Sequence, residues 1–369
     1  AWARTGVQVS ERGERAADLT PALDRVFMSF QSGRPGPAHI EVPLDVAGEV
    51  FTDSGPASTT TAHTNSPDPE MIAQAVQRLD AAAAPVILVG GGARHAGEMV
   101  KAVAERLSAP VVQTVYARGA MYDHPLGVPA SPSLQAVHAL IDSADVVLAL
   151  GTELGQTDYD MYATGIMAKM SSLIRVDICP DQLARHETTI PIIGDAAAAT
   201  AALLKGLGNK ATAAQGAERA ALARRAAFAE IGPEMRALCD VLGAVRKAVP
   251  NAIIVGDSAY PIYAGNLYYD HDRPGGWFNA ATGFGALGYA IPAAIGATLA
   301  DPSAPVICIA GDGGAQFSQP ELMCAVDEKL PITFVIWNSF GYQEIATSMQ
   351  AVDVTVLGCD PTPPDFEYV

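Results

Sequence analysis

Short apolar runs alternate along the chain with longer stretches in which apolar positions recur every three or four residues. Residues 69–83, PEMIAQAVQRLDAAA, and residues 96–109 have the spacing of a helix with one buried face. The runs PVILVGGGA at 85–93 and DVVLALG at 145–151 are apolar almost throughout, as in strands covered on both faces. The same alternation continues through strands at 110–115 and 172–178 and helices at 133–144 and 195–207. This order predicts a parallel, doubly wound sheet.

A second alternation begins near residue 233. It predicts helices at 234–249, 285–300 and 315–328, and buried strands at 252–257, 305–310 and 332–337. Residues 19–46 add an earlier helix and a short strand, AHIEVPL. The predicted fold class is therefore α/β, with two doubly wound parallel-sheet domains that follow the tail of a third.

Changes in composition divide the chain. The expected segments are residues 1–52 (end of the earlier domain), 53–68 (a linker rich in Ser, Thr and Pro), 69–207 (middle domain), 208–232 (a polar linker helix) and 233–369 (last domain). The opening residues have no apolar core of the kind found in a signal peptide. Because the chain begins at Ala1 and stops without a capping pattern, we expect a piece of a longer protein, cut at both ends and truncated in its last domain.

Composition narrows the function classes. The formal net charge is −17, which argues against nucleic acid as a partner. No apolar run approaches the roughly 20 residues of a membrane span. The cysteines form no CxxC pair and no metal-finger spacing; they are Cys179, Cys239, Cys308, Cys324 and Cys359. We therefore expect a protein of a reducing, cytoplasmic compartment without a membrane partner.

Polar residues follow the last two predicted strands of the chain. Gly311 and Asp312 directly follow the run PVICIA, and Asn338 and Ser339 directly follow the run ITFVIW. The carboxyl ends of parallel strands meet at the edge of the sheet where ligands bind. Glycines at 313 and 314 allow close approach of the backbone at a helix start, which attracts phosphate. A carboxylate beside a phosphate requires a cation such as Mg²⁺, so Asp312 with Asn338 or Ser339 is a candidate metal site.

Other familiar motifs are weak or absent. The turn VGGGA lacks the GxGxxG spacing of a dinucleotide-binding loop, and GDGG lacks the lysine of a P-loop. No HExxH pattern is present. For the glycine-rich turn at residues 89–93 a plain strand–helix connection is the favoured interpretation.

The Gly311-Asp312-Gly313 motif and Asn338, which follows Asp312 by 26 residues, together resemble the signature of thiamine diphosphate-dependent enzymes. Residues 282–297 and 32–46 resemble segments of the acetolactate synthase and benzoylformate decarboxylase group. The resemblance implies a pyrimidine-binding domain that ends within residues 1–52, followed by the middle and diphosphate-binding domains.

The resemblance also implies how thiamine diphosphate and Mg²⁺ are held. The implied metal ligands are Asp312, Ser339 and the carbonyl of Gly341. The implied diphosphate contacts are Ala259, Tyr260, Gly311, Gly313, Gly314 and Tyr342. Ser339 departs from the family pattern, because a second asparagine usually occupies this position; whether its hydroxyl binds the metal directly or through water stays open.

Two further positions are implied to hold the cofactor rings. Leu287 corresponds to an apolar wedge that bends the cofactor, and the carbonyl of Gly285 corresponds to an acceptor for its ring amine. A plain core position in a helix is the alternative for Leu287. The catalytic glutamate of the family lies upstream of Ala1, so no catalytic residue is named in this chain. The resemblance implies a homodimer or homotetramer with sites shared between chains.

The phrases VGDSAYPIYAGN and GTELGQTDYDMY resemble a subgroup of 5-guanidino-2-oxopentanoate (2-ketoarginine) decarboxylases. This implies a 2-oxo acid substrate, released as an aldehyde and CO₂. Glu344 and Asp158 are candidate partners of a guanidinium, although a solvated surface position is favoured for each. An acetolactate synthase-like carboligase is the alternative within the family. A catalytically silent protein that binds a nucleotide (FAD among them) or a regulator in the middle domain is the alternative from another class.

Overall fold

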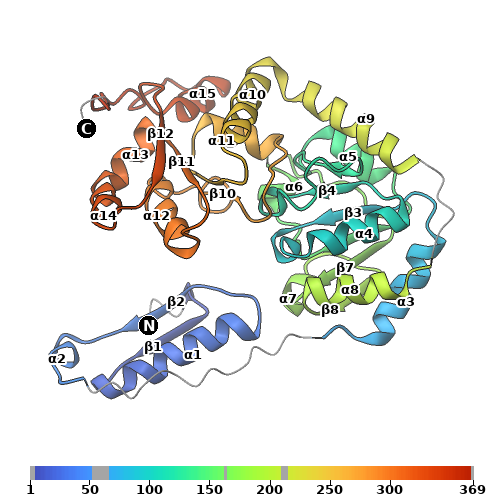
Figure 1. The fold of residues 1–369 in the computed structure, drawn as a ribbon, viewed down its shortest axis with the longest axis horizontal. Coiled ribbons are helices and arrows are strands. Elements are labelled where there is room, and N and C mark those ends of the chain that lie inside the picture. The colour runs from blue at the N-terminus through green and yellow to red at the C-terminus, as the bar shows by residue number, and fades with distance from the viewer. Residues whose placement is uncertain (1–4, 52–65, 162–163, 209–214, 367–369) are drawn as a thin grey trace.

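The structure is a computed structural model that describes residues 5–51, 66–161, 164–208 and 215–366. It contains three parallel sheets, of two, six and four strands (Figure 1). The predicted α/β class with doubly wound parallel sheets is confirmed. Within the described residues, none of the helices combines the length and the apolar character that crossing a membrane requires.

The two-stranded sheet pairs β1 (Val9–Arg12) with β2 (Ala38–Glu41), and α1 (Leu19–Ser32) connects the two strands. A short helix, α2 (Leu44–Ala47), follows. The helix and β2 were expected, whereas β1 was not. Its sequence, VSER, carries little apolar pattern, and only its pairing with β2, from Val9–Ala38 to Arg12–Glu41, makes it a strand.

The six-stranded sheet has the order β5-β4-β3-β6-β7-β8, and all its pairs are parallel. Its strands are β3 (Val86–Val89), β4 (Val111–Gln113), β5 (Gly127–Val128), β6 (Val147–Leu150), β7 (Leu173–Asp177) and β8 (Ile190–Ile193). Its helices are α3 (Pro69–Ala81), α4 (Gly97–Leu107), α5 (Gln135–Asp142), α6 (Gln156–Tyr159), α7 (Pro180–Leu183) and α8 (Ala196–Gly206). From β3 the strand order runs outward to β4 and β5 on one side and to β6, β7 and β8 on the other. The order therefore switches between β3 and β6, the position at which ligands of such sheets bind.

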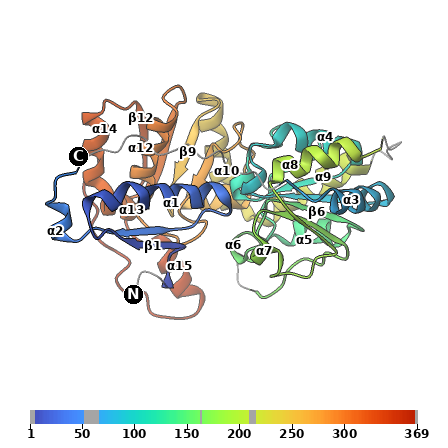
Figure 2. The same ribbon diagram turned by 90° about the horizontal axis from the view of Figure 1, so that it is seen from below.

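Each face of this sheet has its own apolar core. Figure 2 shows α4 and α8 on one side of β6 and α5 on the other. The predicted linker helix begins in the described residues as α9 (Gln215–Glu230) and packs on the α5 side. Its buried positions, Ala220, Ala223 and Ala227, form a stripe of small residues that allows a close approach to α5. Residues 209–214 of the predicted linker helix lie outside the described residues.

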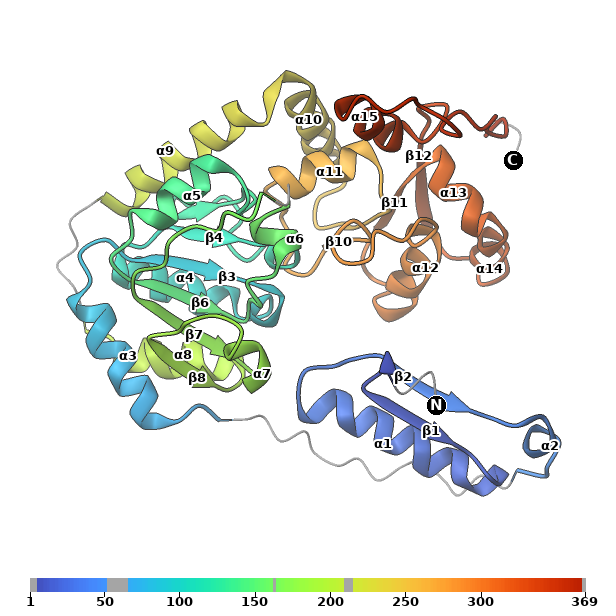
Figure 3. The same cartoon turned by 180° about the vertical axis from the view of Figure 1, so that it is seen from behind.

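The four-stranded sheet has the order β10-β9-β11-β12. Its strands are β9 (Ile253–Gly256), β10 (Trp277–Asn279), β11 (Val306–Gly311) and β12 (Ile332–Trp337). Its helices are α10 (Gly232–Ala248), α11 (Tyr260–Leu267), α12 (Ala290–Ala300), α13 (Asp312–Ser318), α14 (Leu322–Asp327) and α15 (Gln343–Ala351). Figure 3 shows α10 and α11 on one side of β11 and α12 and α13 on the other.

Three expectations for this sheet were wrong in detail. The helix expected at 285–300 begins only at Ala290, because Gly285 and Gly288 have left-handed φ angles of 65° and 84°. Leu287 is therefore a turn residue and not a core position of a helix. The helix expected at 315–328 begins earlier, at Asp312, and is interrupted at Gln319–Glu321, where Pro320 removes a backbone donor. Strand β12, expected to be buried, is half-buried and lies at the edge of the described sheet.

Direct contacts join the six-stranded and four-stranded units. The backbone N–H of Ser131 donates to the carbonyl of Leu267 at 2.8 Å. Arg118 is fully buried and donates to the carbonyls of Tyr269 at 3.1 Å and Asn266 at 3.0 Å. Burial lowers the pKa of Arg118 to about 10, so the guanidinium stays charged at neutral pH. The charge-assisted hydrogen bonds hold the loop after β4 against the end of α11.

Candidate functional site

The carboxyl ends of β9, β11 and β12 surround a cavity of about 300 Å³. The parallel pairing of Gly311 with Trp337 brings the segments after β11 and β12 out side by side. Except for Asn338, the positions proposed from the sequence for cofactor and metal all line this one cavity: Ala259, Tyr260, Gly285, Leu287, Gly311, Asp312, Gly313, Gly314, Ser339, Gly341 and Tyr342. The structure therefore brings together residues that lie as much as 83 positions apart in the chain.

The three proposed metal ligands contact one another. Asp312 is 1% exposed. Its Oδ1 accepts hydrogen bonds from the backbone N–H of Ser339 at 3.1 Å and from the Ser339 hydroxyl at 3.3 Å. Its Oδ2 accepts one from the N–H of Gly341 at 2.9 Å. The Ser339 hydroxyl also lies 3.2 Å from the Gly341 carbonyl, so one carboxylate, one hydroxyl and one carbonyl oxygen form a compact cluster.

This oxygen cluster fits a magnesium ion. With bonds of about 2.1 Å, neighbouring ligand oxygens of an octahedral site lie about 3.0 Å apart. The Ser339 hydroxyl lies 3.3 Å from Oδ1 of Asp312 and 3.2 Å from the Gly341 carbonyl oxygen, close to this separation. Among the described residues no group of three His, Cys, Asp or Glu side chains is placed to bind a metal. A cation at Asp312 would therefore depend on neutral oxygens and on ligand phosphate, which is the usual coordination of Mg²⁺.

Asn338, the other candidate oxygen, is not part of the cluster. Its side chain is exposed, and its Oδ1 accepts a hydrogen bond from the N–H of Phe340 at 3.0 Å. This contact stabilises the turn in which Phe340 has a φ of 60°, unusual for a residue with a side chain. Asn338 thus shapes the loop that presents Ser339 and Gly341.

Glycines make room for the backbone at the cavity. A Cβ at Gly313 would lie 2.5 Å from the Tyr342 ring, and one at Gly341 would lie 2.3 Å from the carbonyl oxygen of Cys359. At Gly314 a Cβ would lie 3.1 Å from the carboxyl carbon of Asp257. A larger residue at any of these positions would displace these neighbours, so the glycines allow the segments around the cavity to pack closely.

Asp257, at the end of β9, supports the turn that carries Gly285 and Leu287. It is fully buried, and its carboxylate accepts hydrogen bonds from the N–H groups of Ser258 at 2.8 Å and Gly288 at 2.9 Å. Burial raises the pKa of Asp257, and the backbone donors oppose that shift. Leu287 is half-buried and presents an apolar side chain at the cavity wall. The Ser258 hydroxyl lies 3.4 Å from the Gly285 carbonyl.

Sequence reasoning missed several wall residues of the same cavity. They are Ser258, Tyr263, Ala281, Trp337, Gln343 and Ile345, which line the cavity together with Glu344. Gln343, Glu344 and Ile345 belong to α15, whose first turn follows the Ser339 loop, and a helix after the second strand end was the available signal. Glu344 was considered only as a possible guanidinium partner with a surface position. Its exposed carboxylate lines the cavity and makes no hydrogen bond or ion pair with another described residue.

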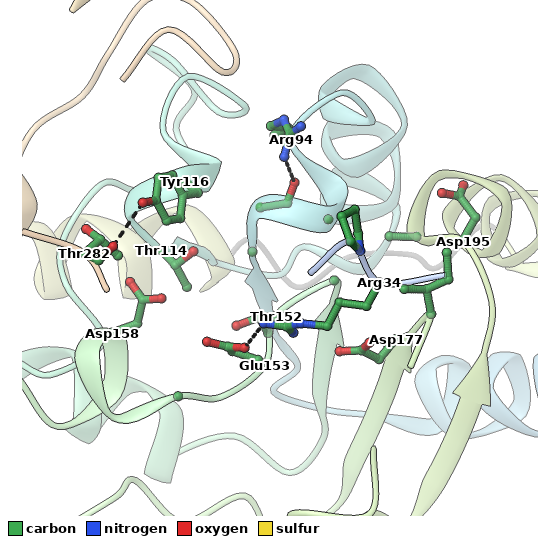
Figure 4. A pocket seen from close by; sticks show the side chains of 18 of the residues that line it. Arg34, Arg94, Thr114, Tyr116, Thr152, Glu153, Asp158, Asp177, Asp195 and Thr282 are labelled. Carbon is green, nitrogen blue, oxygen red and sulfur yellow. Dashed lines mark hydrogen bonds and ion pairs between the residues drawn. The ribbon is translucent and has the colours of Figure 1, made fainter. Parts of the chain in front are cut away.

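A second cavity, of about 560 Å³, lies at the carboxyl ends of β3, β6 and β7, at the switch point of the six-stranded sheet (Figure 4). The turn at residues 90–92 forms part of its wall. A Cβ at Gly90 would lie 2.4 Å from the carbonyl oxygen of Gly151, so this glycine permits close packing of two backbone segments. Arg34 of the N-terminal unit reaches the cavity and forms an ion pair with Glu153.

Asp158 faces this second cavity and not open solvent, so the favoured surface position was wrong. Burial raises the pKa of Asp158 to about 6, and its Oδ1 has only a long hydrogen bond, 3.4 Å, from the N–H of Val115. Figure 4 shows Asp158 near Thr114 and Tyr116, far along the cavity from Asp195.

The fold is that of α/β proteins whose ligands bind at the carboxyl ends of parallel strands, which is where the oxygen cluster lies. Comparison with known families agrees with this. Residues 72–203 match the thiamine pyrophosphate enzyme central domain, and residues 255–369 match the thiamine pyrophosphate enzyme C-terminal TPP binding domain. The chain therefore belongs to the thiamine pyrophosphate enzymes, in which the cofactor is thiamine diphosphate.

Individual relatives fall into two groups. The chain is 35% identical over 356 residues to the "Probable 2-ketoarginine decarboxylase AruI" of Pseudomonas aeruginosa, covering 94% of this chain and 63% of the relative. It is 28% identical over 358 residues to the acetolactate synthase isozyme 3 large subunit of Escherichia coli, covering 88% and 60%. It is 30% identical over 346 residues to the acetolactate synthase large subunit IlvB1 of Mycobacterium tuberculosis, covering 87% and 54%. The chain thus spans about three fifths of the length of these curated relatives.

Proposed function

We propose that the full-length protein is a thiamine diphosphate- and Mg²⁺-dependent enzyme that decarboxylates a 2-oxo acid to an aldehyde and CO₂. The observation that carries the proposal is the oxygen cluster of Asp312, Ser339 and Gly341 at a cavity of the TPP-binding domain. Such a cluster offers oxygen ligands for the cation that a diphosphate requires next to a buried carboxylate.

The residues of this chain would bind and orient the cofactor. Asp312, Ser339 and Gly341 would hold the cation. The glycines at 313 and 314, at the start of α13, would let backbone N–H groups approach the diphosphate. Leu287 would present its apolar side chain to the cofactor rings, and the Gly285 carbonyl would accept a hydrogen bond from the ring amine. Bound thiamine diphosphate supplies the electron sink that a 2-oxo acid needs when its carboxylate leaves.

For the substrate we propose 5-guanidino-2-oxopentanoate. Two observations support this choice. One relative is named a probable 2-ketoarginine decarboxylase. In addition, the carboxylate of Glu344 lines the cofactor cavity and makes no hydrogen bond or ion pair with the described residues, so a guanidinium is a fitting ligand for it. Tyr260 and Tyr263 line the same wall and offer aromatic surface to a planar cation.

Product analysis tests the proposal. The purified full-length protein, loaded with thiamine diphosphate and Mg²⁺, is incubated with 5-guanidino-2-oxopentanoate, with a neutral 2-oxo acid of similar length and with pyruvate. We expect equimolar CO₂ and aldehyde, with the highest kcat/KM for the guanidino acid. An acyloin acid formed from two 2-oxo acids would establish the acetolactate synthase-like carboligase instead. If none of these acids releases CO₂, whether or not the cofactor binds, a catalytically silent binding protein would be favoured.

We further infer that the cofactor site is completed by a second copy of the chain in a homodimer or homotetramer. Large apolar side chains lie exposed on the four-stranded unit: Phe284, Phe317, Met323, Val326 and Phe340. A partner that covers them would remove this surface from water. Analytical ultracentrifugation of the full-length protein tests the inference, and a monomer at micromolar concentration in the presence of cofactor would contradict it.

A further inference from the structure

One turn separates the two cavities. Thr282 and Gly283 line the cavity at the six-stranded sheet, whereas Ala281, Gly285 and Leu287 line the cavity at Asp312. The two positions proposed to hold the cofactor rings therefore belong to a segment whose other side faces the neighbouring unit.

This turn has little conformational preference of its own. Gly283, Gly285 and Gly288 have φ angles of 124°, 65° and 84°. Glycine enters these regions easily and leaves them as easily, so the backbone needs contacts from outside to keep one conformation. Asp257 provides such a contact at Gly288, near the end of the turn. At its beginning the turn closes on itself, because the N–H of Gly285 donates to the carbonyl of Ala280 at 2.9 Å. A contact from outside is still needed to fix this closed turn relative to the neighbouring unit.

Tyr116 of the six-stranded unit provides that contact. Its hydroxyl lies 3.1 Å from the carbonyl oxygen of Thr282 and 3.3 Å from the carbonyl oxygen of Asn279. The single hydroxyl proton is shared between the two acceptors. Figure 4 shows the Tyr116 ring reaching across to Thr282. Partial burial raises the pKa of Tyr116 to about 12, so the hydroxyl is protonated and can donate at neutral pH.

The backbone around Tyr116 is fixed on both sides. Val115 is buried in the core of the four-stranded unit, together with Trp277 and Ile254. Arg118 is anchored to the carbonyls of Asn266 and Tyr269, as described above. A side chain mounted on such a rigid support can impose a position on a flexible partner.

We infer that Tyr116 is a positioning residue that holds the start of the 280–289 turn, and through it the Gly285 carbonyl and the Leu287 side chain, in place for the cofactor. The inference rests on the proposed function, because it concerns the cofactor of that site. Tyr116 itself does not line the cavity at Asp312. Tyr116 acts from the six-stranded unit, so this unit contributes to the geometry of a site that lies in the four-stranded unit.

The test compares Tyr116→Phe with Tyr122→Phe in the full-length protein. Tyr122 is exposed to a similar degree and packs against Arg246 through its ring, and its hydroxyl makes no hydrogen bond to another described residue. Both variants remove one hydroxyl and keep the ring. The first measurement is amide hydrogen exchange of residues 280–289 without cofactor. We expect exchange about 10-fold faster in Tyr116→Phe, as for the loss of one hydrogen bond, and unchanged in Tyr122→Phe.

The second measurement follows the cofactor. We expect Tyr116→Phe to lower kcat about 10-fold with KM for the 2-oxo acid nearly unchanged, and to alter the near-UV circular dichroism of bound thiamine diphosphate. Unchanged exchange, kcat and dichroism in Tyr116→Phe would overturn the inference, and so would equal changes in both variants. If the unaltered protein fails to bind thiamine diphosphate, the proposed function fails and this inference with it. Cofactor binding by the unaltered protein separates the two failures.

Discussion

The backbone N–H of Ser339 donates a hydrogen bond of 3.1 Å to the carboxylate of Asp312, across 27 residues of chain. The two residues meet because β11 and β12 are parallel neighbours and end at the same level, with Gly311 opposite Trp337. Helices α13 and α14 bridge this distance in sequence and return the chain to the sheet. A metal site made from two strand ends therefore depends on the length of the connection as much as on its terminal residues.

Replacement of Asp312 by alanine should abolish binding of thiamine diphosphate, because the diphosphate would lose the cation bound by this carboxylate. We expect the affinity measured by titration calorimetry in the presence of Mg²⁺ to fall about 100-fold or more. Asp327→Ala is the matched control, because it removes an exposed carboxylate at the end of α14, away from the cavity. Unchanged affinity in Asp312→Ala would rule out the metal bridge.

Substitution at Ser339 distinguishes direct from water-mediated coordination. If the hydroxyl binds the metal directly, Ser339→Ala should raise the Mg²⁺ concentration required for half-maximal activity about 10-fold. Ser339→Asn should be tolerated, since an amide oxygen replaces the hydroxyl oxygen. A mild effect of alanine would indicate a bridging water. Loss of cofactor binding in the asparagine variant, with the fold intact by circular dichroism, would show that Ser339 does not occupy a ligand position.

Glu344 should make the enzyme prefer a substrate with a guanidinium group over a neutral 2-oxo acid. We expect Glu344→Gln to raise KM for 5-guanidino-2-oxopentanoate about 10-fold, as for the loss of one charge-assisted hydrogen bond, and to leave KM for a neutral 2-oxo acid unchanged. Glu328→Gln, an exposed acid just after α14, is the matched control. Equal changes in KM for both substrates would assign Glu344 a role in the cavity other than guanidinium recognition.

Asp158 should make stability depend on pH. Burial raises its pKa from 3.8 to about 6 in the folded protein, so ionisation costs the folded state free energy as pH rises between these values. Well below pH 3.8 the carboxyl is protonated in both states and the cost vanishes, so at pH 4 only a small part of it remains. Asp158→Asn should therefore stabilise the protein at pH 7 relative to pH 4, by on the order of 1 kcal/mol once solvent in the cavity is allowed for.

Chemical denaturation of Asp158→Asn and of the unaltered protein at both pH values measures this difference. Asp327→Asn is the control, because its carboxyl is exposed. A free-energy difference that is the same at pH 4 and pH 7 would mean that Asp158 titrates normally.

Much of the fold was determined by local pattern. Apolar runs of strand length, such as residues 86–89 and 147–150, became central strands because a segment apolar on both faces must be covered on both faces. The spacing from Asp312 to Ser339 likewise brought two strand ends together, since the elements between them have nearly fixed lengths. The fold class and the cavity at Asp312 could therefore be predicted from sequence.

Other features depended on contacts that no local pattern contains. The sequence at 285–300 is apolar enough for one long helix, yet Asp257, about 30 residues earlier, accepts the N–H of Gly288 and the helix begins at Ala290. The approach of Tyr116 to Thr282 arises only when the two units pack together, and the burial of Asp158 depends on Val115, 43 residues earlier in the chain. Local pattern determines which segments form strands and helices, because it reflects neighbours in the chain. Tertiary packing decides which polar groups face each other, because their partners come from distant segments.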